Sequence, residues 1–89
     1  MTLNDYRDEA GEFLKARGVD NEHVSKIFAW LDEELAGLKD AADNGNLVEL
    51  RHQIYDVLFL LFELAGRFGL DLDSEWATGR ERKGLKYLS

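Results

Sequence analysis

The sequence has no cysteine and no proline among its 89 residues. The absence of cysteine excludes a disulfide framework and any site built on thiolates. Because no proline interrupts a helix from within, long continuous helices are favoured. There is also no internal repeat, no low-complexity tract and no alternation of apolar and polar residues of the kind that strands show. These absences favour a single helical domain spanning residues 1–89.

Positive charge is scarce, because 11 Lys and Arg stand against 18 Asp and Glu and give a formal net charge of −7. A duplex-binding protein needs a basic surface, so this charge argues against nucleic acid as a partner. The longest apolar run is far below the ~18 residues that a membrane-spanning helix needs. The first residues are polar and do not resemble a signal peptide. We therefore expect a cytoplasmic protein with no membrane partner.

Apolar residues recur at helical spacing in several segments, which predicts an all-α fold. Residues able to cap a helix precede each segment, namely Asn4 or Asp5, Asp20 or Asn21, Asn46, and Asp73. Gly18 and Gly69 are placed to end the first and third helices. The predicted helices span about Tyr6–Arg17, Glu22–Ala42, Leu47–Phe68 and Ser74–Tyr87.

The third predicted helix holds the most apolar stretch, the six consecutive residues Val57–Phe62. Six residues turn more than once around a helix axis, so every side of this segment is apolar. A bundle of 89 residues has little interior in which to cover such a helix. We therefore expect a four-helix bundle that completes its core by forming a homodimer.

Acidic side chains follow one face of each of the two long predicted helices, because residues three, four and seven apart share a face. Where two such helices are antiparallel neighbours, these carboxylates can converge. Oxygen ligands of this kind suit Mg²⁺ or Mn²⁺, and such an ion could hold the phosphates of a nucleotide. Solvated surface charge is the alternative explanation. Glu33, Gly37 and Asp40 share one face of the second helix, with Glu34 next to it, and Glu49, Gln53 and Asp56 form a polar strip on the third.

Four segments follow one another in a recognisable order. The acidic stretch Leu31–Leu35 comes before the aspartate-led apolar run Asp56–Ala65. A glycine-x-aspartate connector, Gly69–Asp73, and a basic segment, Arg82–Tyr87, come after it. Together they resemble the MazG-like, all-α nucleoside triphosphate pyrophosphohydrolase superfamily, over about Trp30–Leu88. The resemblance implies Mg²⁺-dependent hydrolysis of (d)NTPs to (d)NMP and pyrophosphate.

The superfamily binds Mg²⁺ through two acidic pairs, Glu-x-x-Glu on the second helix and Glu-x-x-Asp on the third. In this sequence the first pair is Glu34 with Gly37, and the second is Gln53 with Asp56. The resemblance therefore implies Glu34 and Asp56 as metal ligands, whereas Gly37 has no side chain and Gln53 offers only a neutral oxygen. Glu33 and Glu49 each lie within one helical turn of a missing ligand, so we expect them to assist catalysis. The resemblance implies phosphate contacts from the last helix, where Lys83 and Lys86 are the nearest matches, and we expect Gln53 to contact the nucleotide.

Three functional hypotheses stay open. The first is a nucleotide pyrophosphohydrolase of weak or divergent activity, since two of the four carboxylates are absent. The second is a non-catalytic relative that uses the same dimer to bind nucleotides or a protein partner. The third is an acidic mimic of nucleic acid, which the net charge of −7 permits.

Overall fold

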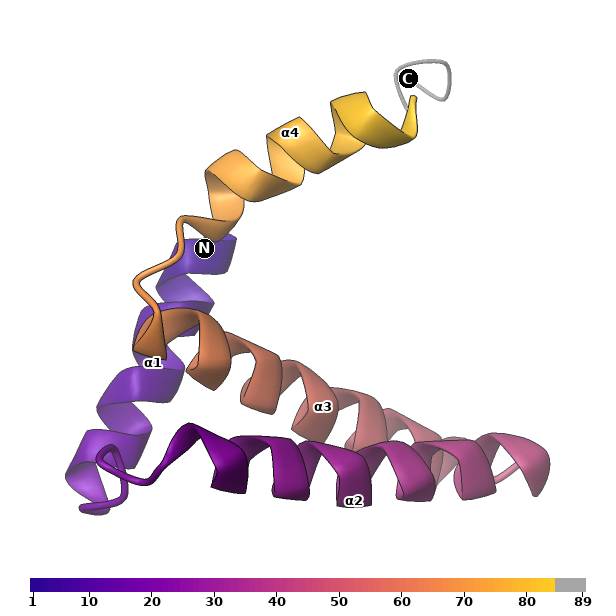
Figure 1. Ribbon diagram of the computed structural model, residues 1–89. Coiled ribbons are helices and arrows are strands. Elements are labelled where there is room, and N and C mark those ends of the chain that lie inside the picture. Colours follow the sequence, from indigo (N-terminus) through magenta and orange to yellow (C-terminus); the bar gives the residue numbers. More distant parts are fainter. Residues whose placement is uncertain (85–89) are drawn as a thin grey trace.

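The computed structural model describes residues 1–84, and within this range the chain forms helices and no strand (Figure 1). The all-α fold and the four helices predicted from the sequence are confirmed. None of the helices in residues 1–84 has both the length and the hydropathy that crossing a lipid bilayer requires. The helices are α1 (Leu3–Ala16), α2 (Val24–Asp43), α3 (Leu47–Arg67) and α4 (Leu72–Lys83).

The cap of α1 differs from the predicted one. The Thr2 hydroxyl accepts a hydrogen bond from the Asp5 N–H, and the Asp5 carboxylate accepts one from the Thr2 N–H. This reciprocal pair is a capping box, so the helix begins at Leu3 and the predicted caps Asn4 and Asp5 lie in its first turn.

The caps of α2 and α4 are also displaced from the predicted residues, whereas Asn46 caps α3 as predicted. His23 caps α2 by accepting the Ser25 N–H, so the predicted caps Asp20 and Asn21 lie in the preceding loop. Asp71 caps α4, which leaves Asp73 in the first turn of that helix.

Glycines end the helices where the chain turns left-handed. Gly18 and Gly69 have φ of 70° and 61°, which confirms their predicted place just after α1 and α3. Gly84, with φ 66°, is the C-cap of α4, which ends at Lys83. The predicted extension to Tyr87 lies outside the described residues.

The body of the molecule consists of α2 and α3, which run side by side as an antiparallel pair, with α1 packed against α3 (Figure 1). Ile27 of α2 is fully buried at this junction. The buried apolar set is small, and it comprises Ala10, Leu14, Ile27, Ala41, Leu60 and Ala65.

The apolar stretch of α3 is covered on only part of its circumference. Leu60 is buried, but Leu58 and Leu61 remain 47% and 44% exposed. Large apolar side chains on α1 and α2, among them Phe13 and Phe28, are similarly exposed. A single copy of the chain therefore leaves uncovered the apolar surface that led us to predict a homodimer.

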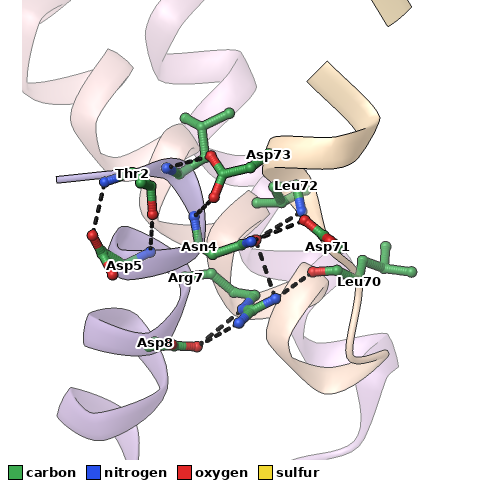
Figure 2. A network of polar contacts seen from close by, with 10 residues as sticks. Thr2, Asn4, Asp5, Arg7, Asp8, Leu70, Asp71, Leu72 and Asp73 are labelled. Carbon is green, nitrogen blue, oxygen red and sulfur yellow. Dashed lines mark hydrogen bonds and ion pairs between the residues drawn. The ribbon is translucent and has the colours of Figure 1, made fainter. Parts of the chain in front are cut away.

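Helix α4 leaves the body and is held at its first turn against α1 (Figure 1). Asp73 accepts hydrogen bonds from the N–H groups of Leu3 and Asn4 (3.0 and 3.3 Å), at the positive end of α1. In return, the Asn4 side chain accepts the Leu72 N–H (2.8 Å) and donates to Asp71 (2.9 Å), as Figure 2 shows.

Arg7 completes this junction by donating to the Leu70 carbonyl (2.6 Å) and to Asn4 (3.2 Å). We call the group Asn4, Arg7, Leu70, Asp71 and Asp73 the α1–α4 clasp. Hydrogen bonds from Asn4 and from the Ser74 N–H, together with the charge of Arg7, hold the pKa of Asp71 below its usual value. Every carboxylate of the clasp has donors, which is the condition under which buried or half-buried charge is stable.

Candidate functional site

The polar faces of α2 and α3 meet at Gly37 and Gln53. A Cβ atom at position 37 would lie 2.9 Å from Gln53 Cδ and 3.0 Å from each heteroatom of its amide. The missing side chain of Gly37 therefore gives the amide its place against α2. Gln53 Nε2 donates to Glu49 Oε1 (3.2 Å), while Gln53 Oε1 is buried and has no hydrogen-bond partner among the described residues.

One helical turn further along the pair, Glu34 of α2 faces Asp56 of α3. Loss of surrounding water is the largest cause that raises the pKa of Glu34 above its usual value. The negative charge of Asp56 and a hydrogen bond shared between the two carboxyl groups raise this pKa further, followed by the charges of Glu33 and Glu49. Glu34 therefore lies close enough to the other three carboxylates for their negative charge to act on it, as expected of a site that receives a cation.

We call Glu33, Glu34, Glu49, Gln53 and Asp56 the acid cluster. The side chains at its centre, Glu34, Gln53 and Asp56, are half-buried, and the two at its edge are exposed. The structure thus brings together the predicted metal ligands, the predicted catalytic glutamates and the predicted glutamine. The chemical roles of these residues stay predictions.

The donor set of the acid cluster fits one hard divalent cation. Two facing carboxylates and an amide oxygen without a partner are the oxygen donors that Mg²⁺ or Mn²⁺ accepts. Within residues 1–84, no three acidic or histidine side chains are set close enough to enclose an ion by themselves. Because Mg²⁺ usually keeps several waters and takes one or two carboxylates plus substrate phosphates, this set fits an ion that shares its coordination with a nucleotide.

The basic residues predicted to contact phosphates lie elsewhere. Lys83 is exposed at the end of α4, which points away from α2 and α3 (Figure 1). A single chain therefore does not bring Lys83 to the acid cluster. Lys86, the other predicted phosphate contact, lies outside the described residues, so both roles stay predictions.

The sequence patterns did not single out one buried acid, Glu63. It lies seven residues after Asp56 on the same face of α3, and only 3% of its surface is exposed. An acid within an apolar helix, in register with a site residue, was the signal that could have found it. The clasp was missed as well, because its hydrogen bonds join residues more than sixty positions apart.

Comparison with known protein families gives a match over nearly all of the chain. The family model described as phosphoribosyl-ATP pyrophosphohydrolase matches residues 2–83, which is nearly the whole chain. Searches of curated proteins and of solved structures give no significant match. This family is part of the MazG-like superfamily that the sequence resembles, so that expectation is confirmed. The chain belongs to the phosphoribosyl-ATP pyrophosphohydrolase family of all-α nucleotide pyrophosphohydrolases.

Proposed function

We propose that the protein is a Mg²⁺- or Mn²⁺-dependent hydrolase that cleaves a nucleotide triphosphate between the α and β phosphates and releases pyrophosphate. The observation that carries this proposal is the facing pair of Glu34 and Asp56 in a chain of this family. The substrates to consider are (d)NTPs, which the sequence resemblance implies, and phosphoribosyl-ATP, which the family description names.

In this proposal Glu34 and Asp56 hold the ion, which would neutralise phosphate charge and polarise the scissile bond. Glu49 lies at the solvent-facing edge of the cluster, where it accepts a hydrogen bond from Gln53. That position suits a general base, with Glu33 as the other candidate. The base takes a proton from water as the water oxygen bonds to the α phosphorus. The bond from this phosphorus to the bridging oxygen breaks, and pyrophosphate leaves with the electron pair.

Homodimer formation is part of the proposal. The exposed Leu58 and Leu61 of α3 support a second copy, because covering large apolar side chains is the main driving force of such association. Since α4 points away from its own acid cluster, we propose that Lys83 and Lys86 neutralise phosphate charge at the cluster of the other copy. Nucleoside triphosphates are cytoplasmic, and we propose the same location for the protein.

A specific observation also favours a second candidate, a nucleotide-binding protein without hydrolysis. Gly37 and Gln53 occupy two positions at which the superfamily pattern has carboxylates, and their contact fills the space between α2 and α3 with a neutral amide. Fewer negative charges weaken the hold on a cation. Binding of a metal–nucleotide complex would then survive while turnover is lost.

The test is pyrophosphate release from a panel of (d)NTPs and phosphoribosyl-ATP, with Mg²⁺ and with Mn²⁺. We expect turnover of at least one substrate by the wild type, strong loss in Glu34→Gln and Asp56→Asn, and no loss in Asp32→Asn. Asp32 is the matched control because it is an exposed acid on the same helix. If no substrate turns over but a non-hydrolysable analogue binds in a metal-dependent manner, the second candidate replaces the first.

A further inference from the structure

A polar hollow lies away from the acid cluster, between α1, the loop that follows it and the last turns of α3. It has a volume of about 520 Å³. Gly11 and Gly66 give it room. Outside the backbone of its own helix and its chain neighbours, a Cβ at position 11 would meet nothing within 4 Å, and one at position 66 would meet only Arg7, at Cγ (3.6 Å) and the carbonyl oxygen (3.9 Å). Its charged lining residues are Arg7, Asp8, Glu12, Asp20, Glu63 and Arg67.

Glu63 is the unusual member of this lining. Its surface is 3% exposed, and neither carboxyl oxygen has a hydrogen-bond partner within residues 1–84. Burial raises the pKa of Glu63, and the charge of Arg67 opposes that rise. Burying a carboxyl group without hydrogen-bond donors costs free energy. Glu63 therefore leaves a strong hydrogen-bond acceptor without a donor at the wall of this hollow.

The charges around Glu63 favour a cation over an anion. Four of the six charged lining residues are acidic. Arg7 is already engaged, since it donates to the Leu70 carbonyl and to Asn4 and pairs with Asp8. Arg67, one turn beyond Glu63, is the remaining cation of the lining and makes no ion pair within 4.0 Å in the part of the chain that the structure describes.

The shape and the donor set favour an organic cation over a metal ion. No three acidic or histidine groups in the described range are grouped as metal ligands. Leu14 and three glycines, Gly11, Gly66 and Gly69, give the hollow walls without charge. An ammonium or guanidinium group can donate several hydrogen bonds to one carboxylate, and a short aliphatic chain would lie along the uncharged walls.

We infer that this hollow is a binding site for a small organic cation, whose ammonium or guanidinium group is held by the Glu63 carboxylate between α1 and α3. The site is separate from the acid cluster, because Glu63 lies two helical turns beyond Asp56 on α3. It does not depend on the hydrolase activity proposed above.

The probes are putrescine and agmatine, with 1,4-butanediol as an uncharged analogue of the same length. Affinity is measured by calorimetry and located by amide chemical shifts in NMR spectra. We expect saturable binding of one or both amines, shifts at Gly11 and Gly66, and no binding of the diol. Glu63→Gln should weaken binding by about tenfold or more. Asp32→Asn removes the same charge from an exposed surface and should leave affinity unchanged.

The Arg67→Gln variant distinguishes amine binding at Glu63 from an internal ion pair between Glu63 and Arg67. If Arg67 competes with the ligand for Glu63, this variant binds the amines more tightly than the wild type. Equal affinity of the wild type and Glu63→Gln, or binding without shifts at Gly11 and Gly66, would reduce the effect to general attraction by an acidic surface and overturn the inference. Absence of saturable binding by both amines would overturn it as well.

Discussion

The α1–α4 clasp and the acid cluster are both rich in carboxylates, but their hydrogen bonding differs. In the clasp, Asp73 accepts two backbone N–H groups, and Asp71 accepts from the Asn4 side chain (Figure 2). Asp71 also accepts from the Ser74 N–H. The pKa of Asp71 is lowered there. In the acid cluster, Glu34 faces Asp56, its pKa is raised, and Gln53 Oε1 has no partner within the described chain.

The difference separates a structural role from a functional one. Satisfied carboxylates at helix N-termini contribute stability, because each removes an unpaired backbone donor and interacts favourably with the helix dipole. Carboxylates that face each other cost stability in the free protein, because their negative charges repel. A cation that joined them would offset this cost, and we therefore propose that the chemistry takes place at Glu34 and Asp56.

The largest expected effect is on activity, from Asp56→Asn. Loss of one of two metal-holding carboxylates should lower kcat/KM by roughly 100-fold or more. Because the substitution removes a charge that repels Glu34, the free energy of unfolding should be unchanged or higher. Steady-state kinetics measure the loss of activity, and urea unfolding of the same preparation measures the free energy of unfolding. A variant that is as active as the wild type, or clearly less stable, would make Asp56 a structural residue like those of the clasp.

The opposite outcome is expected at the clasp, from Asp73→Ala. The N–H groups of Leu3 and Asn4 lose their acceptor, so the free energy of unfolding should fall by about 1–2 kcal/mol. Asp8→Ala is the control, since its side chain is 65% exposed and such an ion pair contributes at most about 1 kcal/mol. Urea unfolding distinguishes the two. Equal losses would show that α4 is not held by these hydrogen bonds.

Glu63→Gln should stabilise the protein in a pH-dependent manner. The pKa of Glu63 is raised in the folded state, so the unfolded chain loses this proton first as pH rises above 4.5. The wild type therefore loses stability from that pH upward through the folded pKa, while the variant does not. Thermal unfolding in amine-free buffer should show little difference near pH 4 and a higher Tm for the variant near pH 7. The reverse trend would mean that Glu63 is ionised and paired, with Arg67 as the candidate partner.

The smallest effect concerns the contact between Gly37 and Gln53. Alanine at position 37 gains about 1 kcal/mol in helix propensity, but its Cβ would force the Gln53 amide to swing away. Gly37→Ala should therefore be nearly neutral in the wild type and stabilising by about 1 kcal/mol in a Gln53→Ala background. Unfolding free energies of the four proteins in this cycle measure the coupling. Simple additivity would contradict the close contact.

Local patterns in the sequence predicted much of this molecule. Helical periodicity identified every helix, and Asn46, Gly18 and Gly69 marked their ends correctly. Spacing also grouped the polar residues of α2 and of α3 on faces that can meet when the two helices are antiparallel neighbours, and the family resemblance selected Glu34 and Asp56 among them.

What the sequence did not predict depends on long-range contacts. Asp73 was expected to cap its own helix, and it instead accepts from the N-terminus of α1. The direction of α4, and with it the distance of Lys83 from the acids, follows from that contact. The burial of Glu63 also depends on a long-range contact, the packing of α1 against α3, which no local sequence pattern predicts.

The most direct test of the central claim is the binding of Mn²⁺ to the acid cluster, followed by electron paramagnetic resonance with and without an α,β-methylene nucleotide analogue. We predict that the wild type takes up Mn²⁺ tightly only when the analogue is present. Glu34→Gln and Asp56→Asn should each weaken this uptake by about tenfold or more, and Asp32→Asn should leave it unchanged. Uptake of Mn²⁺ that is the same in the wild type and in both variants would contradict the account.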